Sequence, residues 1–531
     1  MDGPGRPAAV RTSRFLLGAA AGIALVTVAA RLVGFGRVAV LSRTLGTSCV
    51  GDTYQAANYV PNIVFEIVAG GALASLVVPV LAGAVASGDR AAASRTASAL
   101  LCWTMAALVP VALLGALIAP LLMRALLGDD PSCAGAIETG SRMLVVFMPQ
   151  VVLYGVGIVV AGVLQAHRRF LGPALAPLLS SLVVITAYLL YAARGRVAEL
   201  GQLTRGQELV LSVGTTLGVA ALSLALLVPL RRCGLRLRPT LGFPPGVAVR
   251  VRRLAAAGVA GLAAQQVALV VALRLAAGGP TQGSVIVFTV ATALFLLPWA
   301  VLAVPVATSV FPGLSASAEA DEDAGYAEVA SRSVRVVLLA MTGAAAVLAV
   351  AALPVARLLV RGVPGPESSA VLAAATTAFA PGLVGYGLLA LLARALYARG
   401  DGRTPAVATV VGWLVVAGAD VGLVVALPDV DRVVLLGAGN TVGVSMAGVL
   451  LLLGLRRAAG PPALAGAARS GAAGLAGALL AFGAGSLLPL PDPAPVADLL
   501  AAAGTSLAAA LVFLVVVRLL DPTGLRGLLR A

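Results

Sequence analysis

The stretch RLVGFGRVAVLSRTLG (Arg31–Gly46), followed after a short break by DTYQAANYVPNIVFEIVAGGALASLVVP (Asp52–Pro79), puts strong charges inside two long apolar segments. A charged side chain at the centre of a bilayer is costly, by roughly 2.5 to 3.5 kcal/mol on insertion scales. Arg31 and Arg37 are therefore not expected to face lipid. They predict either a water-filled cavity or an anionic partner for the two guanidinium groups.

The composition of the whole chain is that of a membrane protein. Of its 531 residues, 60% are hydrophobic and only 11% are charged, with a mean hydropathy of +1.02. Soluble domains are about 25% charged. The net charge of +15 would suggest a nucleic-acid partner in a soluble chain, but in a membrane protein it marks the loops that stay in the cytoplasm. We expect no nucleic-acid partner.

Apolar runs of about 20 residues or more predict an all-α polytopic membrane protein with about fourteen transmembrane helices. Arginines gather on every second connecting segment, starting with the N-terminal leader, and several of the other segments carry acidic residues instead. The loop with Arg194, Arg196 and Arg205 is the main exception. The positive-inside rule then predicts a multi-pass membrane protein with both termini in the cytoplasm.

An internal repeat constrains the arrangement of these helices. PQVVLYGVGIVVAGVLQAHRRFLGPA (149–174) aligns without gaps on PGLVGYGLLALLARALYARGDGRTPA (381–406), at an offset of 232 residues. Six spans fit into this offset, so both copies have one orientation, as in many alternating-access transporters. We predict an N-terminal lobe over 1–240, a C-terminal lobe over 241–460 and an appended helix pair over 461–531. The alternative is chance similarity in a sequence of biased composition.

The second charged segment carries a polar stripe on an otherwise apolar helix. Its members follow one another at steps of three or four residues, which places their side chains on one helix face: Asp52, Gln55, Asn58, Asn62 and Glu66. Burying such a face against lipid would be costly. We therefore predict that the stripe lines a cavity and that Asp52, Asn58, Asn62 and Glu66 contact the substrate.

The first charged segment is more ambiguous. Arg31 and Arg37 are six residues apart and point about 120° away from each other on an ideal helix. Gly34 and Gly36 lie between them, and glycine permits a bend or a local unwinding that would turn both guanidinium groups into one cavity.

Two roles are open for these arginines. The planar guanidinium donates paired hydrogen bonds and stays charged, which suits a phosphate-bearing substrate. The alternative is structural, with both arginines forming ion pairs with Asp52 and Glu66. Both arrangements are compatible in different states of one transporter.

Further motifs carry a family resemblance. They are Arg31-x-x-Gly34-x-x-Arg37, Gly46, Asp52, Ala57, Pro61-Asn62, Gly71-Ala72, Val78-Pro79 and the later VLQAHRRFLGPALAP (Val163–Pro177). This pattern resembles the MurJ/MviN family of lipid II flippases, in the multidrug, oligosaccharidyl-lipid and polysaccharide exporter superfamily. The resemblance covers most of the chain.

The resemblance implies a two-lobed, fourteen-helix exporter that carries undecaprenyl-pyrophosphate-linked peptidoglycan precursor from the inner to the outer leaflet by alternating access. Arg31 and Arg37 would match the family's substrate-binding arginines, and Asp52 its acidic residue at the start of helix two. Its partners would be lipid II, membrane lipids and the cell-wall synthesis machinery. We expect no cofactor and no metal.

The chain also departs from the family pattern, because the arginine of helix eight falls on Ala293. Arg274, near the outer end of the seventh span, is a candidate to supply the missing charge to the substrate; snorkelling to the interface is the alternative. This departure leaves a flippase for another polyprenyl-linked oligosaccharide open.

Two other function classes fit the sequence less well than a flippase. A polytopic glycosyltransferase needs acidic residues in an external loop, such as Asp129 and Asp130, but the sequence holds no metal-ligand cluster and no nucleophile with a base. A small-molecule exporter for cationic drugs would be expected to have an acidic cavity. A transporter with a cationic cavity fits better than either class.

The four cysteines form no metal motif. The predicted topology puts Cys49 and Cys133 on the external side, where a disulfide is permitted. Whether the two are bonded is left open by the sequence.

Overall fold

The structure is a computed structural model, and it describes residues 8–67, 74–128, 133–235, 237–243, 247–279, 282–320, 322–360, 367–489 and 494–530. Gly71-Ala72 and the acidic pair Asp129 and Asp130 lie outside the described residues. Within the described ranges every regular element is helical.

The first helices pack as one set, which ends before residue 240. They are α1 (Ala8–Thr44), α2 (Cys49–Glu66), α3 (Ala74–Ala86), α4 (Arg90–Leu117), α5 (Ala119–Leu127), α6 (Ala136–Phe147), α7 (Pro149–Ala166), α8 (Leu171–Ala193), α9 (Arg205–Leu224) and α10 (Leu227–Arg231). A short 3₁₀ turn, η3 (Leu200–Gln202), precedes α9.

A second set follows, and a last group packs outside it. The second set is α11 (Val247–Ala277), α12 (Ser284–Pro298), the π-helical turn η4 (Trp299–Ala303), α13 (Val304–Glu319), α14 (Asp323–Leu359), α15 (Glu367–Phe379), α16 (Gly382–Ala398), α17 (Arg403–Ala426) and α18 (Arg432–Ala459). The last group is η5 (Pro461–Leu464), α19 (Ala467–Ser486), α20 (Pro495–Leu520) and α21 (Pro522–Arg530).

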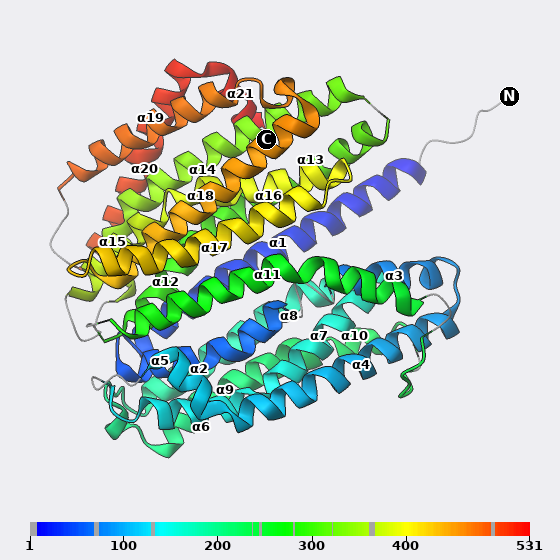
Figure 1. Cartoon of the computed structure of the whole chain (residues 1–531), viewed down its shortest axis with the longest axis vertical. Coiled ribbons are helices and arrows are strands. Elements are labelled where there is room, and N and C mark those ends of the chain that lie inside the picture. Colours follow the sequence, from blue (N-terminus) through cyan, green and yellow to red (C-terminus); the bar gives the residue numbers. More distant parts are fainter. Residues whose placement is uncertain are drawn as a thin grey trace.

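The helices are long and apolar enough for a polytopic membrane protein. Among the described residues, 11 helical stretches could each cross a bilayer, and the pair α15 and α16, bent by 44°, raises this number to 12. The charged helix α1, and α2 together with α3, run along the same bundle (Figure 1). The prediction of an all-α protein with about fourteen spans is confirmed.

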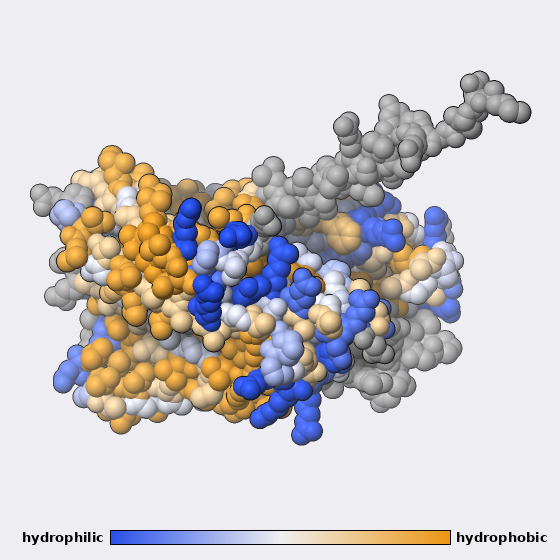
Figure 2. All heavy atoms as spheres, turned by 90° about the horizontal axis from the view of Figure 1, so that it is seen from above, coloured by the Kyte–Doolittle hydropathy of each residue, from blue (hydrophilic) through white to orange (hydrophobic). Residues whose placement is uncertain are grey.

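The bundle has two ends that differ in chemistry. We name one the disulfide end, because Cys49 and Cys133 are bonded there; it holds the α1–α2, α5–α6 and α11–α12 connections (Figure 1). The other, the arginine-rich end, holds the α7–α8, α13–α14 and α16–α17 connections. On the face shown in Figure 2, hydrophilic residues gather in the middle and toward one end, while the other end is mostly hydrophobic.

The two sets of helices pack mainly within themselves, and α19 and α20 pack on α14. Small residues permit this last contact: a Cβ added to Gly343 would lie 2.9 Å from the ring of Phe513, and one added to Gly477 would lie 3.0 Å from it. The outer faces of α19 and α20 expose leucines, with Leu479 and Leu507 both 62% exposed. Such apolar surface is typical of contact with lipid.

The repeated sequence forms the same helix–turn–helix in both copies. Arg168 follows α7 with a φ of 57°, and Gly400, 232 residues later, follows α16 with a φ of 75°. The amide of Arg168 donates to the carbonyl of Gln165 (2.9 Å) and that of Gly400 to the carbonyl of Tyr397 (3.0 Å). In each copy the next amide bonds to a carbonyl five residues back. The alignment therefore pairs equivalent backbone positions.

Candidate functional site

Helix α1 carries the two predicted substrate arginines on a continuous helix. It runs without interruption from Ala8 to Thr44, so the local unwinding considered at Gly34 and Gly36 does not occur in this state. Arg31 is exposed and Arg37 is half-buried. The structure thus places the two arginines at successive levels of one helix.

Open space lies beside α1 between these arginines. A Cβ added to Gly34 or to Gly36 would meet no atom within 4 Å. Farther along the same helix, Leu41 and Leu45 are only 3% and 4% exposed, because the helix packs tightly there. The flank of α1 is therefore open at the level of Gly34 and Gly36 and closed near the disulfide end.

Arg37 is within electrostatic range of tyrosines from three other helices. Its guanidinium interacts electrostatically with the hydroxyl groups of Tyr54 on α2, Tyr154 on α7 and Tyr188 on α8. Tyr54 and Tyr188 also share a hydrogen bond of 3.0 Å between their hydroxyls. These groups are neutral, so the cation has polar neighbours without being neutralised by them.

The polar stripe of α2 meets the same region. The hydroxyl of Tyr154 donates to Oδ1 of Asn62 (3.0 Å), and Nδ2 of Asn62 donates to the carbonyl of Asn58 (2.6 Å). The ring of Phe65 stacks at 4.3 Å from that of Tyr154. The structure therefore brings Asn58 and Asn62 together beside Tyr154, which is within electrostatic range of Arg37.

Glu66 is within electrostatic range of the equivalent tyrosines of the two repeat copies. It is exposed at the end of α2 and interacts electrostatically with Tyr154 and with Tyr386 on α16. Tyr386 is the counterpart of Tyr154 at the offset of 232 residues. The surroundings of Tyr386, in the second set, are aromatic. The ring centroids of Trp299 and Trp413 lie 4.9 and 6.2 Å from that of Tyr386.

We call these residues the central site: Arg37, Asn58, Asn62, Glu66, Tyr154 and Tyr386. The two tyrosines were not among the residues predicted from the sequence. The signal that could have found them is the repeat, in which this tyrosine is one of the few polar residues shared by both copies.

The structural alternative for the arginines is not seen in this state. The ion pairs between described residues are Arg142 with Glu138 and with Glu208, Arg205 with Glu208, Arg357 with Asp498, and Arg399 with Asp323. Within this part of the chain, neither Arg31 nor Arg37 pairs with a carboxylate.

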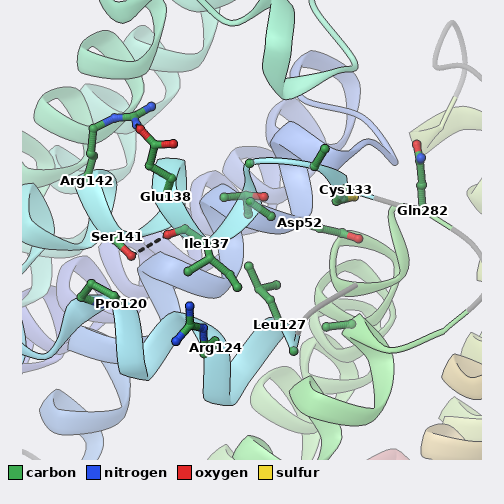
Figure 3. Close-up of a pocket in the computed structure, with 16 residues that line it drawn as sticks. Asp52, Pro120, Arg124, Leu127, Cys133, Ile137, Glu138, Ser141, Arg142 and Gln282 are labelled. Atoms are coloured by element: carbon green, nitrogen blue, oxygen red, sulfur yellow. Dashed lines mark hydrogen bonds and ion pairs between the residues drawn. The ribbon is translucent and has the colours of Figure 1, made fainter. Parts of the chain in front are cut away.

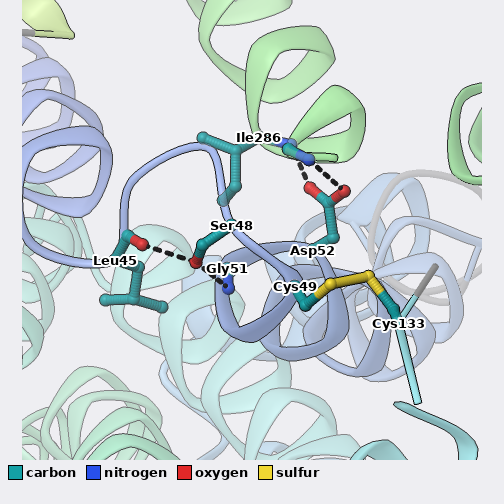
Figure 4. The surroundings of a disulfide bond; sticks show 8 residues. Leu45, Ser48, Cys49, Gly51, Asp52, Cys133 and Ile286 are labelled. Atoms are coloured by element: carbon teal, nitrogen blue, oxygen red, sulfur yellow. Dashed lines mark hydrogen bonds between the residues drawn. A yellow bond between two sulfur atoms is a disulfide. The ribbon is translucent and has the colours of Figure 1, made fainter. Parts of the chain in front are cut away.

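Asp52 has a different environment from the rest of the stripe. It is only 8% exposed, and its carboxylate accepts hydrogen bonds from the backbone of α12 in the second set (Figure 4). The amide of Gly283 donates to Oδ2 (2.8 Å) and that of Ile286 to Oδ1 (3.0 Å). Asp52 thus caps the N-terminus of α12, where the helix dipole favours an anion.

Other contacts at the disulfide end join the same two sets of helices. Thr47 and Ser368 share a hydrogen bond between their hydroxyls (3.0 Å), and Ser42 donates to the carbonyl of Leu359 (3.1 Å). Arg43 donates from Nη2 to the carbonyl of Leu358 (2.7 Å). We call these contacts, with those of Asp52, the latch.

The latch depends on glycine at one position. Gly283, the N-cap of α12, has a φ of 86°, which favours glycine, and a Cβ there would collide with the backbone of Thr47. The α1–α2 connection can therefore lie directly against the start of α12.

A disulfide supports the latch from the first set. Cys49 at the start of α2 is bonded to Cys133, which precedes α6, with a Cα–Cα distance of 5.5 Å (Figure 4). This resolves the pairing that the sequence left open. Cys102 and Cys233 are free.

Arg274 also lies at the disulfide end, away from the central site. A Cβ added to Gly128, which ends α5, would lie 2.7 Å from Nη2 of Arg274, so the guanidinium packs against the end of that helix. The structure therefore places this arginine at the contact between α11 and α5. It does not bring Arg274 together with Arg31 and Arg37.

A pocket of about 550 Å³ opens beside the latch, between α2, α5, α6 and the α11–α12 connection (Figure 3). Asp52 forms part of its wall, and Arg124, Glu138, Arg142 and Gln282 give it a polar rim. Asp52 thus stands between this pocket and the start of α12.

Asp420 is a buried carboxyl in the second set of helices. It is only 1% exposed in α17 and lies against Gly439 of α18. In the part of the chain that the structure describes, no group of three or more His, Cys, Asp or Glu side chains is placed to hold a metal ion.

Comparisons with known proteins agree on one family. Residues 41–488 match the family model described as "Lipid II flippase MurJ". The chain is 28% identical over 395 residues to a probable lipid II flippase MurJ of Rhizobium meliloti, covering 71% of this chain and 70% of the relative. It is also 28% identical over 447 residues to the lipid II flippase MurJ of Burkholderia cenocepacia, covering 81% and 82%.

Solved structures share the fold. A lipid II flippase MurJ in an inward closed conformation matches with a TM-score of 0.74 at 15% identity, over 94% of this chain and 98% of that chain. An inward-facing multidrug resistance MATE family transporter of the MOP superfamily matches with a TM-score of 0.67 at 14% identity, over 83% and 98%.

Proposed function

Because the chain belongs to the MurJ family of lipid II flippases, we propose that it carries lipid II, the undecaprenyl-pyrophosphate-linked peptidoglycan precursor, from the inner to the outer leaflet of the bacterial cytoplasmic membrane. The family match spans both sets of helices. The chain is a transporter rather than an enzyme.

In this proposal the disulfide end faces outward and the arginine-rich end faces the cytoplasm, which puts both termini in the cytoplasm. Arginines in cytoplasmic loops fit the positive-inside rule. A disulfide between Cys49 and Cys133 fits an oxidising exterior. The two features favour the same orientation independently.

The pyrophosphate binds at the central site. The geometry around Arg37 supports this assignment. Among the described residues its guanidinium is not paired with a carboxylate, it is within electrostatic range of Tyr154 and Tyr188, and open space lies beside α1 at Gly34 and Gly36. A diphosphate supplies the negative charge and the acceptors that paired guanidinium donors require. Arg31, one level closer to the arginine-rich end, meets the headgroup first.

The neutral polar groups suit the sugar part of the headgroup. The amides of Asn58 and Asn62 and the hydroxyl of Tyr154 offer both donors and acceptors. Glu66 adds a carboxylate at the side of the second set, where the amino groups of a peptide can bind. The polyprenyl tail stays in lipid, along the apolar outer faces of α19 and α20.

Transport then takes place by rocking of two lobes, α1–α10 and α11–α18, around the central site. The latch keeps the lobes together at the outer end while α1 is open on its flank, so this state is closed to the outside. When the latch opens, the 550 Å³ pocket beside Asp52 joins the space between the lobes. Asp52 and Arg274 hold this closure rather than the substrate.

The proposal is tested by complementation. Expression of the chain in bacteria depleted of their own lipid II flippase should restore growth and the arrival of lipid II at the outer leaflet. Arg37→Ala should abolish rescue at unchanged abundance in the membrane, because the pyrophosphate loses its cation, and Arg31→Ala should reduce it.

Arg95→Ala is the matched control, since Arg95 is an exposed arginine of α4 outside the central site. It should support growth like the unchanged chain. Full rescue by Arg37→Ala would assign that arginine a structural role and remove the basis for this site.

A further inference from the structure

A second pocket with an unexplained set of arginines lies at the arginine-rich end. It has a volume of about 810 Å³ and is enclosed by α1, the start of α8 and the break between α9 and α10. Its described lining includes Arg168, Arg169 and Arg232 and no carboxylate. The rest of the lining is almost entirely apolar: Val26, Phe170, Leu171, Leu175, Leu179, Leu226, Val228 and Pro229.

One of these arginines occupies an unfavourable backbone position. Arg168 has a φ of 57° and, in the part of the chain that the structure describes, no other residue except glycine has a positive φ. The left-handed region is disfavoured for residues with a Cβ, and strain of this kind is often retained where a side chain has a function. The internal repeat gives a direct comparison, because the equivalent turn has Gly400 with a φ of 75°.

The three cations gather at one edge of the pocket. Arg168 and Arg169 are adjacent in the α7–α8 turn, and Nη2 of Arg169 donates to the carbonyl of Arg232 at the end of α10 (2.9 Å). All three side chains are exposed. The turn is thus tied to the end of α10, which concentrates positive charge without a compensating carboxylate in the pocket.

The apolar part of the pocket opens toward the outer surface of the bundle. Leu171, Leu179 and Val228 are 54%, 41% and 62% exposed. An occupant of this pocket must therefore combine an anionic group at one end with a hydrocarbon chain at the other. Basic pockets between transmembrane helices on the cytoplasmic side bind lipid headgroups of this kind.

We propose that this pocket binds an anionic phospholipid of the cytoplasmic leaflet, with its phosphate at Arg168, Arg169 and Arg232 and an acyl chain along α8 and α10. The site is separate from the central site, because Tyr154 and Arg168 are about 20 Å apart along α7. The proposal therefore goes beyond the transport of lipid II and does not depend on it.

The glycine of the second repeat copy supplies the test variant. Arg168→Gly removes the cation and also relieves the backbone, so the variant should fold at least as well as the unchanged chain. Thermal unfolding of the purified full chain in detergent is measured with added phosphatidylglycerol and with phosphatidylcholine of the same acyl chains. Phosphatidylglycerol should raise the unfolding temperature of the unchanged chain by several degrees, and phosphatidylcholine should not.

In Arg168→Gly this shift should fall by at least half, while the unfolding temperature without lipid does not fall. A second variant, Arg169→Gln with Arg232→Gln, should lose the shift as well. Arg403→Gln is the control, because Arg403 is an exposed arginine just after the equivalent turn of the second copy, and it should keep the full shift.

Three results would overturn the proposal. An equal shift in Arg168→Gly and the unchanged chain would exclude this pocket as the site. If Arg403→Gln lost as much of the rise in unfolding temperature as Arg168→Gly, the lipid would be attracted to surface charge in general. If inorganic phosphate raised the unfolding temperature as much as phosphatidylglycerol, the pocket would be a site for the ion alone. None of these results bears on complementation, so failure here and failure of the proposed transport are distinguishable.

Discussion

Asp52 shows how a single carboxylate can join two halves of a membrane protein. It is almost fully buried, yet the amides of Gly283 and Ile286 donate to its two oxygens. An unpaired carboxylate in this position would be very costly, while one at a helix N-terminus is stabilised by free amides and by the helix dipole. The contact is therefore favourable only while α12 lies against α2.

Replacing Asp52 by asparagine should weaken the latch without changing its shape. The loss of charge at the helix N-terminus should cost about 1 kcal/mol, which is about a fivefold increase in the outward-open population. Labelling of Ser368→Cys by a membrane-impermeant maleimide, in a Cys49→Ser and Cys133→Ser background, should become faster by about this factor. Glu138→Gln at the same end is the control, and an unchanged rate in Asp52→Asn would contradict the role of the latch.

Asp521, between α20 and α21, predicts a dependence of stability on pH. Burial alone would raise the pKa of this carboxyl, but hydrogen bonds from Ser470, the Gly524 amide and Thr523, with the Arg469 charge, outweigh it and lower the pKa below its usual 3.8. A lowered pKa means that the ionised form stabilises the fold above about pH 4 and that this stabilisation is lost as the pH falls through the folded pKa.

Asp521→Asn should therefore destabilise the protein by about 1 kcal/mol at pH 7, and by progressively less as the pH falls below 3.8 toward the folded pKa, where the aspartate itself becomes protonated. Thermal unfolding of both proteins over a pH series from 7 downward measures the difference. A difference that does not depend on pH would mean that only packing is lost.

At this scale the sequence predicted which residues share a helix face, but not what lies opposite them. Asn58 and Asn62 of the polar stripe on α2 do lie together, and Tyr154 donates a hydrogen bond to Asn62. Asp52 belongs to the same stripe and instead caps a helix more than 200 residues away in the chain. Periodicity describes one helix only, so the partner of each residue could not be read from it.

Close helix contacts depend on glycine within the second set. A Cβ added to Gly385 on α16 would collide with the carbonyl of Val444 on α18, which is backbone and cannot rotate away. Gly422 on α17 is exposed, and a Cβ there would meet no atom within 4 Å. The two glycines should therefore respond in opposite directions to the same substitution.

Gly385→Ala should destabilise the protein by roughly 1 to 3 kcal/mol, because the helices must move apart. Gly422→Ala should stabilise it by about 0.5 to 1 kcal/mol, because alanine loses less conformational freedom in a helix. The unfolding temperatures of both variants in detergent give the comparison. Similar destabilisation in both would contradict the packing described for α16 and α18.

The helix that begins with α12 is broken after one of its prolines. Pro298, Pro305 and Pro312 recur every seven residues, a pattern that indicates a bending element but does not show which proline bends the helix. The structure has a π-helical turn directly after Pro298 and none at Pro312, which lies inside α13. Proline removes one hydrogen bond, and whether the helix then bends or adds a residue to its turn depends on neighbouring helices.

For the molecule as a whole, closure of one end is the feature that a transport cycle must reverse. The hydroxyls of Thr47 and Ser368 are 3.0 Å apart across the latch, close enough for cysteines at these positions to bond. In a Cys49→Ser and Cys133→Ser background, oxidation of Thr47→Cys with Ser368→Cys should stop rescue of flippase-depleted cells. A reductant should restore it.

The single substitution Thr47→Cys in the same background is the control and should be insensitive to the oxidant. Continued rescue by the cross-linked protein would show that this end need not open, and the rocking cycle would then be wrong.

The sequence could predict the class, the span number and the two chemically different ends, because each depends on composition or on short patterns. It could not predict the conformational state. That state depends on contacts such as Ser42 with Leu359 and Thr47 with Ser368, which join distant parts of the chain. Two states of a transporter differ by only a few kcal/mol, and such a difference is not visible in local patterns.

The vacant flank of α1 at Gly34 and Gly36 has a pharmacological consequence. A rigid compound bound against Gly34 and Gly36 would gain contact area without displacing protein atoms. An acidic group on this compound would reach Arg37. An antibiotic of this shape would jam the carrier in the state described. Resistance would then be expected to arise by replacing either glycine with a bulkier residue.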